Sequence, residues 1–449
     1  RSSNQLQKVS ASVLRVKLKF FTIGMSILYI RIRQIDKHGI YNSVRQRTKG
    51  KEFMTRTSSR GEKENTISDV EAGFVISKDF ERFNQINDIF TRAFWDNKIR
   101  TKETDAFFEG HRKQFTVRNS AGFRQKDFAL RNASWAVSDM FSSRSETEGK
   151  REGFQALMDN ETLVAKEKLS IEDVKAFTDE LKTVAKLFGA DLVGITLIDD
   201  RWHYSKRVDT RGFKPVSNDL PGSFSHVIVL GHSMNKQLVD TYPSALASAG
   251  TGLEYSREAA ILTQLTSYIR SLGYDAVGSM NDTALAIPYA IKAGLGEYGR
   301  NQLVITPEFG PRVRFSKIFT NIPLSPDHAI RYGITEYCTN CTKCSDACPP
   351  KALPYGKPTF HSGNQSTISG VKKWSANCEK CFGYWAKIKT DCAICMRVCP
   401  FNRDFSELSG KIFWRLATGR FQSLALWWEK RIGISNQVKP DVWWLTARP

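Results

Sequence analysis

The sequence predicts an α/β domain that leads directly into a cysteine-rich module. From about residue 165 to residue 330, segments with the hydrophobic period of a helix alternate with short apolar segments typical of buried strands. Beyond this region, all nine cysteines of the 449-residue chain lie between Cys338 and Cys399. The first observation predicts mixed helix and sheet, and the second predicts a separate metal-binding part.

Three helices are predicted in the α/β region, at residues 170–189, 256–273 and 282–293. Ser170 is expected to cap the first helix and Gly189 to end it. Ser256 is expected to open the second helix and Gly273 to end it, while Pro288 is expected to kink or break the third. Strands are expected at residues 192–198, 227–230, 276–277, 302–306 and 312–319.

The N-terminal 60 residues differ from the rest of the chain in charge. They hold 14 Lys or Arg against 2 acidic residues, and so carry +12 of the net charge of +20. Their apolar run, residues 20–30, has 11 residues, whereas about 20 are needed to span a bilayer. Residues 1–60 are interpreted as a basic leader or an untranslated or degenerate segment, residues 61–164 as a region that wraps the core, and residues 406–449 as an aromatic C-terminal tail whose tryptophans are expected to serve packing or a dimer contact.

The cysteine spacing predicts two 4Fe-4S clusters. The first run has the C-x2-C-x2-C-x3-C-P spacing of a bacterial ferredoxin, in which the last cysteine of each run binds the other cluster. The second run lacks its opening cysteine, because Lys389 stands there, so a cysteine further upstream must replace it. The expected ligands of cluster 1 are Cys338, Cys341, Cys344 and Cys399. The expected ligands of cluster 2 are Cys348, Cys381, Cys392 and Cys395, which leaves Cys378 over.

The cysteines could also form a pair of zinc sites or a set of disulfides. A pair of zinc sites would use four ligands in C-x2-C pairs and would not need the C-P ending of each run. A disulfide framework is typical of short secreted chains, and nine is an odd number of cysteines. Both are therefore less favoured than clusters.

The α/β region contains no generic nucleotide or esterase motif, but it places polar side chains in apolar surroundings. These are Thr251, Tyr255, Asn281, Arg312 and Arg314. Spacing alone leaves an ordinary structural role open for each of them, as a buried hydroxyl, a turn residue or a solvated charge.

Several longer stretches resemble the corrinoid-dependent reductive dehalogenases, specifically the tetrachloroethene dehalogenase branch. They are residues 293–300 (AGLGEYGR), 305–314 (ITPEFGPRVR), 319–324 (FTNIPL) and the cysteine window, and the similarity runs from about residue 165 to residue 405. The resemblance implies a nitroreductase-like domain at 165–330 that binds a cobalamin-type corrinoid, beside a two-cluster module at 331–405. It also implies an anaerobic enzyme of organohalide respiration that replaces a carbon–halogen bond with carbon–hydrogen.

The resemblance also assigns roles to individual residues. It makes Tyr255 the proton donor, Arg314 the fixed charge that stabilises its phenolate, and Asn281 the residue that orients substrate or halide. Thr251 and Trp385 are expected to line the substrate pocket. The family shares the missing cysteine of the second run, which favours Cys381 over Cys378 as its replacement.

The expected partners are a small organohalide and an electron donor such as ferredoxin, flavodoxin or a quinol-linked protein, with a membrane anchor protein as a further candidate and no nucleic acid. Because the chain contains no Arg-Arg pair, no twin-arginine signal is seen and a cytoplasmic location is predicted, with the outer face of the cytoplasmic membrane as the alternative.

Two other functions stay open. An epoxyqueuosine reductase-like enzyme would act on tRNA, but the segment Glu254-Tyr255-Ser256-Arg257 and Arg314 argue against it. A non-catalytic iron–sulfur electron carrier would not need the α/β domain and would contain no cobalt.

Overall fold

The computed structural model describes residues 66–69, 72–110, 120–141, 154–209, 212–220, 223–432 and 437–446. The expected leader at residues 1–60 lies outside these ranges. The described chain opens with a hairpin of β1 (Thr66–Asp69) and β2 (Phe74–Ser77), followed by η1 (Gln85–Asn87) and by α4 (Ile89–Trp95), α5 (Lys102–Glu109) and α6 (Gln125–Ser134). None of its described helices is both long enough and apolar enough to cross a membrane.

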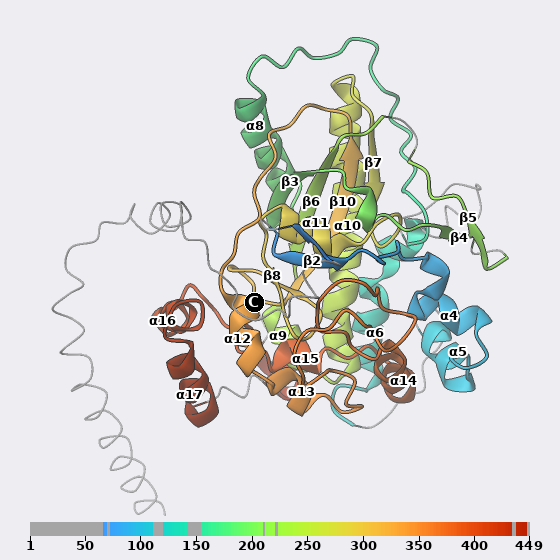
Figure 1. Cartoon of the computed structure of the whole chain (residues 1–449). Helices are drawn as coiled ribbons and strands as arrows, with labels where there is room; N and C mark the ends of the chain where they lie inside the picture. Colours follow the sequence, from blue (N-terminus) through green and yellow to red (C-terminus); the bar gives the residue numbers. More distant parts are fainter. Residues whose placement is uncertain are drawn as a thin grey trace, which may run out of the picture. The chain divides into compact units, whose positions relative to one another are not determined.

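A four-stranded antiparallel sheet forms the centre of the next region (Figure 1). Its order is β3 (Leu192–Leu197), β6 (His226–Ser233), β10 (Val313–Thr320) and β7 (Ala276–Ser279). Along β6, Ile228 and Leu230 belong to one buried cluster, and Val227 and Val229 belong to another. Because successive side chains of a strand point to opposite faces, the sheet is buried on both sides.

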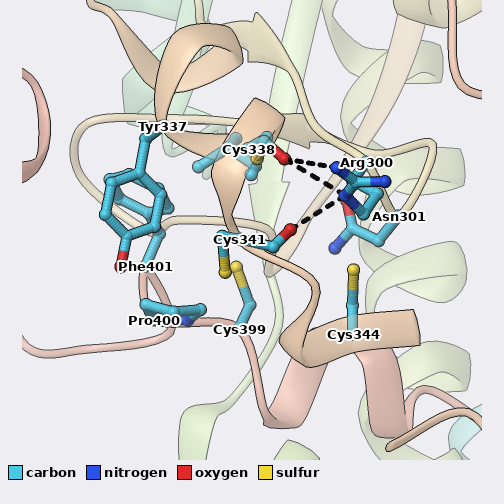
Figure 2. A pocket seen from close by; sticks show the side chains of 10 residues that line it. Arg300, Asn301, Tyr337, Cys338, Cys341, Cys344, Cys399, Pro400 and Phe401 are labelled. Atoms are coloured by element: carbon cyan, nitrogen blue, oxygen red, sulfur yellow. Dashed lines mark hydrogen bonds between the residues drawn. The ribbon is translucent and has the colours of Figure 1, made fainter. Parts of the chain in front are cut away.

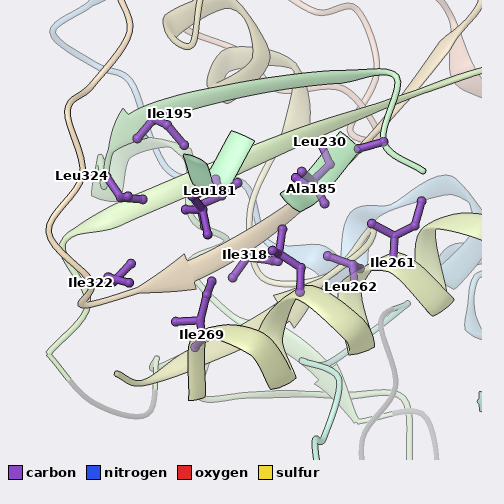
Figure 3. Packing of buried hydrophobic residues seen from close by; sticks show 14 of the residues in the cluster. Leu181, Ala185, Ile195, Leu230, Ile261, Leu262, Ile269, Ile318, Ile322 and Leu324 are labelled. Carbon is purple, nitrogen blue, oxygen red and sulfur yellow. The ribbon is translucent and has the colours of Figure 1, made fainter. Parts of the chain in front are cut away.

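Helices cover the two faces of this sheet. On one face, α8 (Val174–Leu187) and α10 (Ala245–Ser271) pack Leu181, Leu262 and Ile269 against the strand residues Ile195 and Ile318 (Figure 3). On the other face lies α11 (Ala286–Lys292). The predicted mixture of helix and sheet is therefore present.

The second predicted helix begins much earlier than expected. Ser244 is its N-cap and accepts a hydrogen bond from the amide of Ala247 at 3.0 Å, so the prediction that Ser256 opens the helix is wrong. The early turns consist of small residues that show no hydrophobic period. Their smallness has a structural reason, because a Cβ atom on Gly252 would lie 2.2 Å from Ser134 Oγ of α6. Ser256 instead lies inside α10 and donates to the Ser134 carbonyl at 2.7 Å.

The other two predicted helices, in contrast, begin later than expected. The cap of α8 is Asp173, not Ser170, because the Asp173 carboxylate accepts from the amides of Lys175 and Ala176, both at 2.9 Å. The prediction that Pro288 kinks or breaks its helix is wrong as well. It lies in the first turn of α11, where its missing amide hydrogen costs no helical hydrogen bond.

Short elements connect these parts: η2 (Asp200–Trp202), β4 (Arg207–Asp209), β5 (Lys214–Val216), α9 (Lys236–Val239), β8 (Glu297–Tyr298) and β9 (Val304–Ile305). The cysteine-rich region contains α12 (Ile334–Asn340), α13 (Lys343–Ala347), α14 (Cys378–Ile388) and α15 (Ile394–Arg397). The chain continues through α16 (Leu408–Ala417), α17 (Gln422–Ile432) and α18 (Pro440–Thr446). In this tail, Trp444 Nε1 donates to Asp127 of α6 at 2.7 Å and Trp414 packs against Phe401, as a packing role requires, whereas Trp427 is about half exposed.

Candidate functional site

The three residues predicted to carry the chemistry meet at one hydroxyl group. Tyr255 comes from α10, Asn281 follows β7, and Arg314 lies on β10. Asn281 Nδ2 donates to Tyr255 Oη at 2.7 Å, and the Arg314 guanidinium donates to the same oxygen. The carbon of that guanidinium also lies 3.7 Å from the centre of the Tyr255 ring. Both hydrogen bonds use lone pairs of the phenol oxygen, so neither consumes the hydroxyl hydrogen.

Aromatic side chains from the region before residue 165 cover Tyr255. Trp135 stacks on its ring with centroids 4.7 Å apart, and the Phe154 ring lies 5.4 Å away. Tyr255 is buried as a result, whereas the neighbouring Asn281 is exposed. Sequence reasoning missed Trp135 and Phe154, because nothing in their local pattern links them to a tyrosine more than 100 residues away.

Opposing effects act on the proton of Tyr255. Burial raises the pKa of the phenol, and this outweighs the lowering of the pKa by the Arg314 charge and by the Asn281 hydrogen bond. The Glu258 charge raises the pKa further. The expected stabilisation by Arg314 is therefore present, yet the net effect keeps Tyr255 protonated around neutral pH.

A second group of buried charges lies behind this site and was not predicted. Glu258 is 1% exposed, and burial raises its pKa to about 7. Burial raises the pKa of Asp282 to about 7 and lowers the pKa of Lys317 to about 8. The Lys317 ammonium donates to the Met280 carbonyl at 2.5 Å. Because Lys317 attracts both carboxylates and the two carboxylates repel each other in a dry environment, the protonation of the three groups is coupled.

The two expected pocket residues have other described partners. Thr251 lies one turn before Tyr255 on α10, and its hydroxyl donates to the buried Asp391 carboxylate at 2.8 Å. Tyr242 donates to the same carboxylate at 2.8 Å. Asp391 directly precedes Cys392 in the chain. Trp385 of α14 packs among aromatic residues of α4 and α5, namely Phe90, Phe107 and Phe108. Their role at a substrate pocket stays a prediction.

The four cysteines expected to bind cluster 1 line one pocket (Figure 2). They are Cys338, Cys341, Cys344 and Cys399, and each has a free thiol. Burial and the neighbouring cysteines raise the pKa of Cys399, which agrees with this grouping. Arg300, Asn301 and Tyr337 line the same pocket. In the part of the chain that the structure describes, no three His, Cys, Asp or Glu side chains form a site for a single metal ion.

The cysteines expected to bind cluster 2 also lie near one another. Cys348, Cys381 and Cys395 pack in one cluster of contacts, together with Cys344 of the first set. Burial is the largest cause of the raised pKa of Cys395, and the next largest causes are the neighbouring Cys381 and Cys392. Cys378 instead lies 3.0 Å from the Thr367 hydroxyl and packs with residues of α4 and α5.

Comparisons with known proteins find similarity in both of these regions of the chain. Residues 208–324 match the family model of the reductive dehalogenase subunit, and residues 337–402 match that of the 4Fe-4S double cluster binding domain. The chain is 35% identical over 274 residues to the tetrachloroethene reductive dehalogenase of Sulfurospirillum multivorans. The matched segment covers 56% of this chain and 55% of that protein. Over its central part the chain thus resembles the reductive dehalogenases.

Further reductive dehalogenases resemble the chain to a similar extent. A tetrachloroethene reductive dehalogenase of Desulfitobacterium hafniense is 33% identical over 301 residues, or 58% of this chain and 54% of that protein. The chain thus spans about half the length of the curated relatives it matches. Among solved structures, the catabolic reductive dehalogenase NpRdhA matches with a TM-score of 0.63 at 20% identity, over 82% of this chain and 49% of that chain, which confirms the predicted fold.

Proposed function

We propose that this chain is a reductive dehalogenase, which replaces a carbon–halogen bond of a small organohalide with a carbon–hydrogen bond. The observation that carries the proposal is the phenol of Tyr255, which accepts hydrogen bonds from Asn281 and Arg314 and keeps its own hydrogen. Support comes from the relatives, whose names describe the dehalogenation of tetrachloroethene. The reaction consumes two electrons and one proton and releases a halide ion.

The cysteine sites fit two 4Fe-4S clusters. Four free thiols line the pocket of Figure 2, and burial keeps them protonated in the absence of metal, since it raises the pKa of Cys344 to about 12. Thiols bound to iron lose their protons, so the positive charge of iron offsets this cost. The proposed ligand sets are those expected from the spacing, with Cys381 in the second set because it packs with Cys348 and Cys395.

The surroundings of Tyr255 fit a further bound group. Nε of Arg314 is buried and has no hydrogen-bond partner among the described residues, so it remains available to a cofactor or a substrate. When bound, a cobalamin-type corrinoid reduced through the two clusters would supply the electrons that break the carbon–halogen bond. The protein contributes position, charge and the proton.

The residues of the site would act in a defined order. Substrate enters from the exposed side of Asn281, and the Tyr255 O–H then gives its proton to the carbon from which the halide leaves. The negative charge left on Tyr255 Oη is stabilised at once by two donors already in place, the Asn281 amide and the Arg314 guanidinium. Because the raised pKa keeps the proton on Tyr255 between turnovers, the donor is ready at neutral pH.

The partners follow from this chemistry. An electron donor of the ferredoxin, flavodoxin or quinol-linked type would deliver electrons one at a time to the clusters, and oxygen-labile clusters require an anaerobic setting such as organohalide respiration. The expectations of a cytoplasmic location and of a membrane anchor protein stay predictions. The tRNA-reductase alternative has less support, since an epoxyqueuosine reductase of Lactococcus garvieae matches only 29% of this chain, at 32% identity over 138 residues.

The test is halide release by the anaerobically reconstituted protein. Iron, sulfide and cobalamin are supplied, bound iron and cobalt are measured, and organohalides of several classes are offered with a strong chemical reductant. We expect Tyr255→Phe to keep the metals and to lose about 100-fold or more of the halide-release rate, as loss of a general acid does. A wild-type protein that binds eight irons without cobalt would indicate an electron carrier, and cobalt without halide release would favour the tRNA reductase.

A further inference from the structure

Arg300 has an unusual position in the pocket lined by Cys338, Cys341, Cys344 and Cys399. It follows β8, is 1% exposed, and lies against the C-terminal end of α12, which carries Cys338 and ends at Cys341 (Figure 2). Its guanidinium donates six hydrogen bonds, all to backbone carbonyls. The acceptors are Cys338 at 3.1 and 2.9 Å, Cys341 at 2.8 Å, Thr339 at 3.1 Å, Pro354 at 3.0 Å and Gly356 at 2.9 Å.

The charge of Arg300 is not neutralised by an acidic side chain. Within the described residues no ion pair of Arg300 is found, whereas the nearby buried Arg403 pairs with Glu429. Carbonyl groups satisfy the N–H donors of Arg300 but carry no net charge. A buried cation without an anion is costly, so its position beside four thiols indicates that a negatively charged group completes the site.

We propose that Arg300 sets the reduction potential of the cluster held by Cys338, Cys341, Cys344 and Cys399. The proposal rests on the cluster assignment of the proposed function. A 4Fe-4S cluster with four thiolates is already anionic, and it gains one more negative charge when it takes up an electron. A fixed positive charge in a dry pocket favours the more negative form, so Arg300 raises the potential and makes this cluster the better electron acceptor.

The geometry also explains why the residue is an arginine. Its planar group binds the carbonyls of residues 338, 339 and 341 and those of residues 354 and 356 at the same time, so it holds the C-terminal end of α12 against a second segment. A lysine carries the same charge with only three donors and no fixed fork. The charge and the clamp can therefore be separated by substitution, with Arg300→Lys keeping the charge and Arg300→Gln removing it.

The experiment is a redox titration of the anaerobically reconstituted full chain, followed by electron paramagnetic resonance, with bound iron measured for every variant. In Arg300→Gln we expect the ratio of reduced to oxidised cluster at a fixed potential to fall about tenfold, a shift of about 59 mV for one electron. Arg300→Lys is expected to stay near the wild-type ratio. The signal of the other cluster serves as an internal reference.

Arg270→Gln is the matched control. Its guanidinium also donates to backbone carbonyls, those of Thr162 at 2.5 Å and Ala276 at 3.4 Å, but in the sheet domain. It should leave both potentials unchanged. An Arg300→Gln protein that holds all its iron and has the wild-type potential would overturn the proposal. Loss of iron in both Arg300 variants would also overturn it, because Arg300 would then be only a clamp. If Arg300→Gln alone loses iron, a lowered potential in Arg300→Lys overturns the proposal and an unchanged one supports it. A wild-type protein that binds no iron would instead refute the cluster assignment itself.

Discussion

Replacing Glu258 by glutamine should change how the stability of the protein depends on pH. Glu258 lies three residues after Tyr255 on α10, is 1% exposed, and neither of its carboxylate oxygens has a hydrogen-bond partner among the described residues. Burial raises its pKa from 4.5 to about 7, although the charges of Arg314 and Lys317 oppose this. The folded protein therefore holds the proton of Glu258 more tightly than the unfolded chain does.

The sign and size of the effect follow from this difference in pKa. Between pH 4.5 and about 7 the folded state binds more protons than the unfolded state. The stabilisation that comes from proton binding by Glu258 is therefore full below pH 4.5 and is lost as the pH rises through 7. The whole change corresponds to about 3 kcal/mol of unfolding free energy. Glu258→Gln removes the titration, so its stability relative to wild type should rise by about this amount between pH 4.5 and pH 8.

The assay is urea unfolding of the anaerobically prepared protein at several pH values between 5 and 8, with wild type and Glu258→Gln measured in parallel. Loss of the negative charge should also lower the pKa of Tyr255, which absorbance of the tyrosinate detects, with Tyr255→Phe as the control. Two unfolding profiles that run parallel across this pH range would refute the reasoning, since Glu258 would then titrate as an ordinary exposed carboxyl group.

Three other predictions test contacts described above. Thr251→Val removes the hydroxyl that bonds to a buried carboxylate, and should lower the unfolding free energy by about 1–3 kcal/mol in urea titrations; unchanged stability with a raised KM would support a direct substrate contact instead. Cys381→Ser should lose the iron of one cluster in a colorimetric assay while Cys378→Ser keeps eight irons, and the reverse result would exchange their roles. Gly252→Ala should destabilise the protein by about 1–3 kcal/mol and displace Trp135, whose fluorescence would report it; a wild-type spectrum and stability would contradict the close packing of the two helices.

Two parts of the protein could be predicted from local patterns. The ferredoxin-like spacing already assigned Cys338 and its partners to cluster sites, because three thiols on one tight loop have only a few ways to bind one group. The strands at residues 192–198 and 312–319 were found within one or two residues, because buried strands are short runs of apolar residues. Helix starts were less predictable, since Asp173 and Ser170 are both acceptable caps and only the folded chain selects one.

The resemblance to a family, rather than the local pattern, singled out Tyr255, Asn281 and Arg314. The three residues lie on different elements, and only the tertiary structure shows that they meet at one phenol oxygen. Other contributions to the site depend on the fold alone. Trp135 and Phe154 reach Tyr255 from the region before residue 165, and no sequence pattern records such a contact.

The sequence by itself determined which chemical groups this protein has, and the tertiary structure decided what surrounds them. Cysteine spacing is a local property, so the chain alone predicts thiols that bind clusters. Charge environments are not local, because burial depends on what other segments place around a group. Thus Glu258 holds its proton to about pH 7, and Arg300 lies beside four thiols with no ion-pair partner among the described residues, only because distant segments exclude water from both.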